Sequence, residues 1–326
     1  MFKINKKNYE KYIYGSFISS CWGWTFNLKT QKEKYKKILE KEWEINFFDL
    51  EEFSDEEFLI SWYWVWKPKW EEKNFLKLLK KWFNEFQKIC WDKKISWIVP
   101  GEIWWELTAI EMANELNLKL VNWDLVWWRA VPEISMDCFW VNNKKITPAI
   151  LVWENEEILI LKNCSTEILE NISREFFENT WWSVWLIWYL ISVKDAKKNL
   201  PQKSIENNLE IWEKFSLNYE KNFLWEWEIF SIKEKESKWF DKKIIKIWDE
   251  KKYFEINICN EFLSVKDSEW NFLAKAPEKI FLIDKKNLEP IYSKEIFLWQ
   301  IVKIFSTEEE FFWKEDENKK IFEKYF

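Results

Sequence analysis

Hydrophobic positions in the first 130 residues switch repeatedly between helical and strand spacing. Apolar side chains recur every three or four residues in some segments and form short continuous runs in others. The expected helices cover residues 6–19, 30–42 and 71–90, and the expected strands cover 44–50 and 94–100. Residues 58–70 are expected to form a strand that runs into a glycine-type loop. Helices that alternate with strands predict an α/β layer in which the sheet is at least partly parallel.

The pattern changes in the second half of the chain. Residues 134–163 indicate short strands, and 164–179 indicate a helix with Ser165 or Thr166 at its N-cap. From about residue 223 onward, apolar and polar positions alternate as in half-buried strands. We therefore predict an α/β (α+β) protein. Its N-terminal α/β domain with a mixed sheet covers 1–180, and a β-rich C-terminal domain covers 181–326.

Charge and hydropathy exclude several classes of partner. The net charge is −6 and charges of both signs are interspersed, so no basic face for nucleic acid is expected. The longest apolar-looking run, 181–191, is too short to span a bilayer, and the N-terminus lacks the apolar core of a signal peptide. Five scattered cysteines without a C-x-x-C pair are typical of reduced thiols. These features predict a cytoplasmic protein that binds neither nucleic acid nor membrane.

The composition contains 29 Trp and only 3 Gly. A chain of 326 residues usually has about 20 glycines. Trp also stands where glycine is expected, in turn-like segments at Trp248 and Trp270 and directly after helical segments at Trp43, Trp91 and Trp182. Our hypothesis is that most Trp letters represent glycine, as in bacteria that read the UGA codon as glycine. The alternative is a Trp-rich lectin-like or membrane-interface protein.

Residues 100–133 hold the side chains best suited to chemistry. Glu102 follows one predicted strand and Asp124 follows the next. Ligands of parallel sheets bind beyond the carboxyl ends of the strands, so these two carboxylates could face one crevice. The candidate side chains of the stretch are Glu102, Asn122, Asp124, Arg129 and Glu133.

Glycine-type positions accompany these charges. Two Trp pairs, Trp104–Trp105 and Trp127–Trp128, flank them, and as glycines they would let backbone amides reach a ligand. A further glycine-rich loop at 19–27 includes Trp22, Gly23 and Trp24. Its backbone N–H groups could approach an anion or a carbonyl, and the alternative is a tight turn.

With Trp read as Gly, the chain resembles the S-methyl thiohydantoin desulfurase family, long catalogued as domain of unknown function 917. The resemblance is carried by the segments SSCWGWTF, VPGEIWWE and LVNWDLVWWRAVPEISM, the last of which is similar to the family's D-x-D-G-x-GRA-x-PE signature. NTWWSVWLIWYLIS, ICNEFLSV and the segment from residue 277 to 305 extend the resemblance over most of the chain. Two positions depart from the family. Asn122 stands where Asp is usual, and Cys21 stands where a small or hydroxyl residue is commoner.

The resemblance implies a two-domain enzyme that hydrolyses a cyclic thioimidate and releases a thiol, or related hydantoin-like chemistry. Attack by water needs a base and a group that stabilises developing charge. Glu102 or Asp124 would be the base, and Arg129 would orient a carbonyl or carboxylate. Glu133 would hold Arg129, while Asn122 and the glycine-type loops would bind substrate. Asn122 cannot act as a base.

Alternatives remain for each of these residues. The charges could form structural ion pairs. Clustered carboxylates could also hold a divalent metal, which is possible but not favoured, and the cofactor is otherwise unknown. The absence of His excludes a Ser-His-Asp triad, a Cys-His pair and a His-ligated zinc. A cysteine nucleophile at Cys21 is the least favoured mechanism.

Three classes of function follow. The favoured one is a hydrolase acting on a hydantoin-like small molecule. The second is a non-catalytic binder or accessory subunit of hydantoinase- or oxoprolinase-type enzymes, because the family is often linked to their genes. The third, a Trp-rich carbohydrate or membrane binder, requires genuine tryptophans. A homo-oligomer or a hydantoinase-type partner is compatible with the first two.

Overall fold

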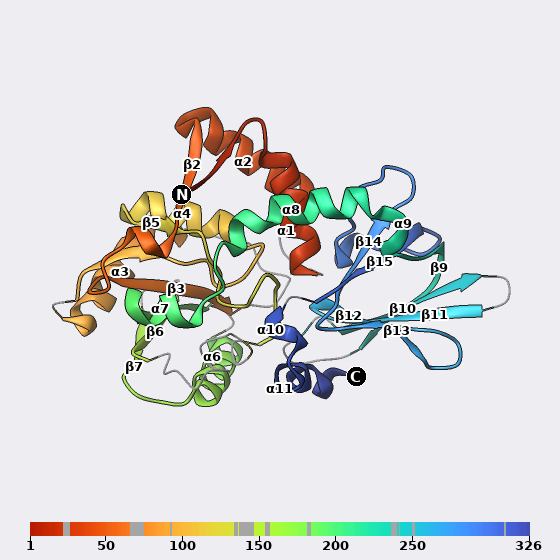
Figure 1. The fold of residues 1–326 in the computed structure, drawn as a ribbon. Helices are drawn as coiled ribbons and strands as arrows, with labels where there is room; N and C mark the ends of the chain where they lie inside the picture. The colour runs from red at the N-terminus through yellow and green to blue at the C-terminus, as the bar shows by residue number, and fades with distance from the viewer. Residues whose placement is uncertain are drawn as a thin grey trace. The chain divides into compact units, whose positions relative to one another are not determined.

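A computed structural model describes residues 1–21, 27–65, 75–91, 93–133, 136, 147–153, 157–180, 184–235, 240, 242–249, 252–309 and 311–326. Its described strands form an eight-stranded sheet and a seven-stranded sheet (Figure 1). No helix among these residues is long and apolar enough to cross a membrane.

The first sheet is mixed, with strand order β1-β2-β5-β4-β3-β8-β6-β7. The strands β2, β5, β4 and β3 are parallel to one another, whereas the remaining pairs are antiparallel. The strand bounds are β1 Phe2–Asn5, β2 Glu44–Phe48, β3 Phe58–Val65, β4 Ile95–Ile98, β5 Lys119–Val121, β6 Ala149–Trp153, β7 Ile158–Leu161 and β8 Val184–Ser192. The expected mixed α/β sheet is confirmed.

Helices pack against this sheet through apolar faces. The helices α3 (Phe75–Cys90), α4 (Glu106–Leu116) and α6 (Thr166–Thr180) contact its strands, and α7 (Val193–Asn199) follows β8. Burial in β2 alternates along the strand, with Ile45 and Phe47 buried, because successive side chains point to opposite faces. The parallel centre therefore has an apolar core and places its carboxyl-end loops at one edge.

The second sheet is antiparallel, in the order β13-β12-β11-β10-β9-β15-β14. Its strand bounds are β9 Phe223–Lys235, β10 Lys242–Asp249, β11 Lys252–Cys259, β12 Glu261–Lys266, β13 Phe272–Lys275, β14 Lys279–Asp284 and β15 Ile301–Thr307. The expected β-rich C-terminal half is confirmed. The helices of this half and of the N-terminus are α1 Tyr9–Ser20, α2 Leu28–Glu42, α8 Ser204–Leu217, α9 Tyr219–Asn222, α10 Phe311–Lys314 and α11 Asp316–Lys319.

Strand β14 shows how the second sheet uses both of its faces. Ile280 and Leu282 belong to a large apolar cluster with the neighbouring strands. Phe281 points to the other face, where it packs with Ile18 of α1 and Phe215 of α8. The period of two along a strand separates the two sets of side chains. The N-terminal helix α1 therefore packs on the C-terminal sheet.

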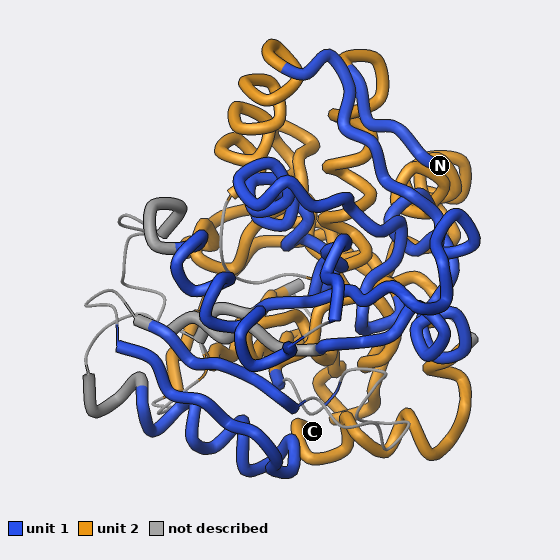
Figure 2. Tube along the Cα trace, turned by 90° about the vertical axis from the view of Figure 1, so that its left-hand side faces the viewer, with its two compact units in different colours: residues 1–5, 42–127, 133–206 blue, residues 6–41, 128–132, 207–326 orange. Residues whose placement is uncertain are grey.

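The chain divides into two compact units that are not continuous in sequence (Figure 2). Unit 1 consists of residues 1–5, 42–127 and 133–206, and unit 2 consists of 6–41, 128–132 and 207–326. The division falls twice within the candidate stretch, after Trp127 and before Glu133. The predicted domain boundary at residue 180 stays a prediction.

The backbone at many Trp positions has the conformation typical of glycine. The described residues include twelve non-glycine residues at positive φ, and seven of them are Trp. Trp accounts for 29 of 326 residues, so twelve random positions would include about one. The seven are Trp43, Trp91, Trp104, Trp127, Trp128, Trp270 and Trp299.

Three of these seven lie in the turn-like or helix-end segments where the sequence indicated glycine. Trp43 and Trp91 directly follow α2 and α3, at φ 62° and 56°, and Trp270 closes a turn at φ 68°. Trp182 lies outside the described residues. The turn expected at Trp248 is wrong, because Trp248 lies in β10 and pairs with Tyr253 of β11. The glycine hypothesis itself stays a prediction.

Candidate functional site

Two adjacent parallel strands position the candidate carboxylates. Strands β4 and β5 pair in parallel, and Glu102 and Asp124 lie in the loops that follow them. The two loops are joined where the Leu125 N–H donates to the Gly101 carbonyl at 3.3 Å. The sheet thus brings the loops of Glu102 and Asp124 side by side, at the edge where parallel sheets bind ligands.

Asp124 is fully buried and shapes its own loop. Its Oδ1 accepts a hydrogen bond from the Val126 N–H at 2.6 Å, a local turn that short acidic side chains favour. Its own backbone N–H donates to Ser204 Oγ at 2.7 Å. One carboxylate oxygen therefore has a structural role, and the side chain is held in a fixed position.

Glu102 is also buried, with 3% of its surface exposed. Its Oε1 accepts a hydrogen bond from the indole Nε1 of Trp105 at 2.6 Å. Trp105 occupies the N-cap of α4, where it makes no side-chain capping bond. Ser, Thr, Asp, Asn and Gly are preferred at this position, and of these Gly alone caps without a side chain. A large buried indole thus lies against a buried carboxylate.

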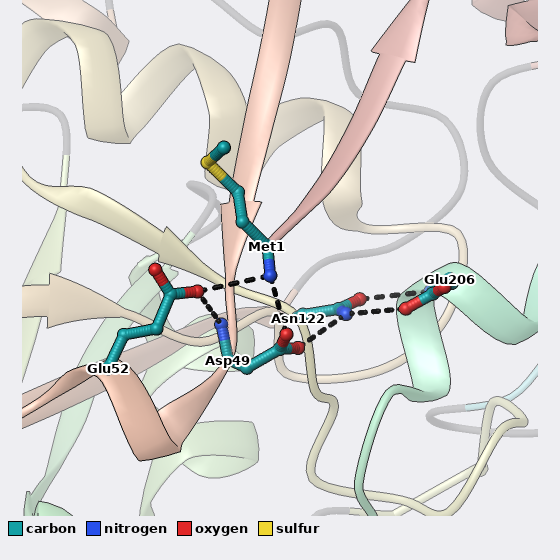
Figure 3. A network of polar contacts seen from close by, with 5 residues as sticks. All are labelled: Met1, Asp49, Glu52, Asn122 and Glu206. Atoms are coloured by element: carbon teal, nitrogen blue, oxygen red, sulfur yellow. Dashed lines mark hydrogen bonds and ion pairs between the residues drawn. The ribbon is translucent and has the colours of Figure 1, made fainter.

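Asn122 is the centre of a polar network at the end of β5 (Figure 3). Its Nδ2 donates to Asp49 Oδ1 at 2.8 Å and to Glu206 Oε2 at 3.2 Å. The Glu206 N–H donates back to Asn122 Oδ1 at 3.0 Å. One buried amide therefore bridges two carboxylates, which an aspartate at this position could not do.

Asp49 links this network to the chain terminus. Its Oδ2 lies 2.6 Å from the Met1 ammonium, and Glu52 Oε1 lies 3.1 Å from the same group. Burial alone would raise the pKa of Asp49, but hydrogen bonds from the ammonium and from Asn122 outweigh it and lower the pKa. Asp49 is therefore the charged acceptor that the Asn122 amide requires.

Arg129 belongs to unit 2 and is completely buried there. Its Nε donates to the Ala130 carbonyl at 3.0 Å, and one terminal nitrogen donates to the Pro277 carbonyl at 2.7 Å. The guanidinium carbon lies 4.5 Å from the centre of the Phe322 ring. These contacts give Arg129 a structural role within unit 2, where it joins residues 128–132 to Pro277, just before β14, and to the C-terminal 3-10 helix Lys320–Tyr325.

The remaining candidates differ in burial. Glu133 is half-buried at the edge of a unit 1 segment, and its carbonyl accepts from the Met136 N–H at 3.0 Å. Trp127 is half-buried at φ 55°, and Trp104 is buried at φ 86°. Trp22, Gly23 and Trp24 lie outside the described residues. Cys21 is buried, and burial raises the pKa of its thiol.

A hollow of about 930 Å³ lies within unit 2, and Trp128 forms part of its wall. The floor includes the apolar side chains of Ile211 and Phe215 from α8, and polar groups such as Lys221 and Asn222 also line it. Trp128 is held at φ 62°.

The sequence did not indicate Asp49, Ser204 or Glu206 as members of the site. Asp49 could have been found, because Asp49 and Glu52 form a capping box around a short 3-10 helix, a spacing visible in the sequence. Glu206 and Ser204 lie 84 and 80 residues along the chain from their partners Asn122 and Asp124, so no local sequence pattern could indicate them. Among the described residues, no group of three or more acidic or cysteine side chains is arranged to hold a metal ion.

The fold and the buried acidic loops define an α/β protein with its candidate site at the carboxyl edge of parallel strands. Residues 23–163 match the family described as S-Me-THD-like, N-terminal domain. The match covers the segment that contains the signature, and over this segment the resemblance expected from the motifs is confirmed.

The solved structures include a similar protein from Chromobacterium violaceum. Its crystal structure superimposes with a TM-score of 0.74 at 15% sequence identity, over 99% of this chain and 96% of that chain. This likeness shows a shared fold. Among curated proteins, none matches the sequence.

Proposed function

We propose that the protein hydrolyses an S-methyl thiohydantoin or a related hydantoin-type ring. The observation that supports this most is the pair of buried carboxylates, Glu102 and Asp124, on adjacent loops of an S-Me-THD-like domain. Carboxylates held in fixed positions can act as general bases towards water.

In the proposed reaction, water attacks the ring carbon that carries the S-methyl group. The base, Asp124 or else Glu102, takes a proton from the water as the new C–O bond forms. The C=N π bond opens as water adds, and the ring nitrogen takes up one proton. The C–S bond then breaks as a C=O bond forms at the ring carbon, and the departing thiolate takes up the other proton to leave as methanethiol. Water thus supplies the oxygen, the proton on nitrogen and the proton on sulfur, and no oxidant or reductant is required.

The activity is tested with a glycine-restored chain. We define this as the full chain with Trp→Gly at the seven positive-φ positions and at Trp105. It is expected to release methanethiol from an S-methyl thiohydantoin, and Asp124→Asn is expected to abolish the release. Asn keeps an oxygen that can accept from the Val126 N–H, so the loop should persist.

Ser204→Ala is the matched control for loop distortion. It removes the acceptor of the Asp124 N–H but leaves the carboxylate intact, so most of the activity should remain. Full activity in Asp124→Asn would exclude Asp124 as the base and leave Glu102. If both acidic residues could be neutralised without loss, the proposed mechanism would be rejected.

The second candidate is a non-catalytic binder or accessory subunit. It is favoured by the Asn122 network, because Asn122 serves as a bridge between two carboxylates and cannot be a base. Tight binding of the ring without thiol release would support this alternative.

A further inference from the structure

The loops around Glu102 contain indoles at positions suited to glycine. Trp104 is buried at φ 86°, and Trp127 stands at φ 55° on the neighbouring loop. A side chain with a Cβ is disfavoured at such φ values, whereas glycine adopts them freely. Trp105 occupies an N-cap, which glycine fills well and an indole does not. The positive φ values therefore indicate glycine at Trp104 and Trp127, whereas at Trp105, with φ −95°, glycine is indicated by the N-cap position.

The Trp105 indole also identifies what its space could hold. The pyrrole part of the indole is a planar five-membered ring, and its N–H donates to Glu102 Oε1 at 2.6 Å. A carboxylate with 3% exposure needs hydrogen-bond donors to offset its lost hydration. If residue 105 is glycine, this donor is missing and its place beside Glu102 becomes open to a ligand.

We propose that Trp104, Trp105 and Trp127 are glycines in the natural protein, and that the space of the Trp105 indole is the pocket of a planar five-membered ring. An N–H of that ring donates to the Glu102 carboxylate, as the indole N–H does in the printed chain. The negative carboxylate selects a neutral ring with an N–H and disfavours an anionic ligand. The choice of a hydantoin-type ring rests on the proposed function.

The identity of the residues is tested by peptide mass. Trypsin cleaves after Lys94, Lys119 and Arg129, so residues 95–119 and 120–129 form two peptides. In protein isolated from cells that carry the gene, both peptides should have glycine at positions 104, 105 and 127. Tryptophan at position 105 would overturn the proposal.

The pocket is tested by calorimetry on the glycine-restored chain with two probes, hydantoin and 1,3-dimethylhydantoin. Hydantoin is expected to bind at least about tenfold more tightly, because the dimethyl compound has no N–H for Glu102. Glu102→Gln should weaken hydantoin binding about tenfold, since a charge-assisted hydrogen bond becomes a neutral one. If the glycine-restored chain bound the two probes equally, the proposal would be overturned whatever the result for Glu102→Gln.

The control is Glu115→Gln, near the other end of α4, where Glu115 pairs with Lys80 at 2.9 Å. It should leave hydantoin binding unchanged, and thermal unfolding should show that Glu102→Gln remains folded. Thiol release without discrimination between the probes would refute the pocket and leave the hydrolase proposal intact. Discrimination without thiol release would support the pocket and refute the reaction.

Discussion

Asn122 stands where the family usually has Asp, and its hydrogen bonds to two carboxylates predict what the family residue would do in this protein. Asn122→Asp restores the usual residue of the family but should destabilise this protein. The variant loses both hydrogen bonds donated by Nδ2, to Asp49 and to Glu206. It also places a buried carboxylate between two half-buried ones. Each lost hydrogen bond to a charged acceptor is worth about 1.5–3 kcal/mol, so a loss of at least about 3 kcal/mol is expected at pH 7.

The loss should depend on pH with a definite sign. Two neighbouring carboxylates and burial would raise the folded-state pKa of the introduced carboxyl group. Its destabilising effect should therefore appear as pH rises above its unfolded pKa of about 3.9, and it should shrink at lower pH. Urea unfolding of the variant and the parent at several pH values measures this difference.

A second substitution provides the control. Glu206→Gln in the Asn122→Asp background returns an amide donor to the network, because the glutamine side chain introduced at position 206 can donate to the carboxylate introduced at position 122. It should recover roughly 1–2 kcal/mol of the loss. The reasoning would be refuted if Asn122→Asp were as stable as the parent at pH 7, or if the second change gave no recovery.

Two further predictions concern stability. Four exposed tryptophans at positive φ strain the printed chain, so replacing them together by glycine should increase the free energy of unfolding by about 2–4 kcal/mol in urea. As controls, Trp227→Gly in β9 and Trp248→Gly in β10 should each decrease the free energy of unfolding. If the control substitutions and the four positive-φ substitutions had the same effect, backbone strain at the positive-φ positions would be contradicted. The four are Trp43, Trp91, Trp270 and Trp299. Burial raises the pKa of Glu278, so stability should fall as pH rises above the usual glutamate range, and a pH titration of Glu278→Gln should lack this fall.

Local pattern was sufficient to place most elements. The helix expected at 30–42 is α2, Leu28–Glu42, and the strand expected at 94–100 contains β4, Ile95–Ile98. Apolar spacing carries this information because one face of each element must be buried. Trp248 lies inside β10, one residue before its end, so its turn-like sequence context does not place it in the turn itself.

The partners of the site residues could not be predicted from the sequence. Asn122 meets Asp49 and Glu206, which are 73 and 84 residues away in the chain. Arg129 meets Pro277, 148 residues away, so its expected role towards a ligand competes with a structural one. Such pairings depend on the order of the strands and on where α1 and α8 pack, which local spacing does not specify.

The glycine hypothesis underlies the family signature, the activity assay and the proposed pocket alike. The most direct test is the intact mass of the protein isolated from cells that carry its gene. The mass should lie below 40.8 kDa by the difference between a tryptophan and a glycine residue for each exchanged position. A measured mass of 40.8 kDa would show that the tryptophans are genuine and would contradict the account.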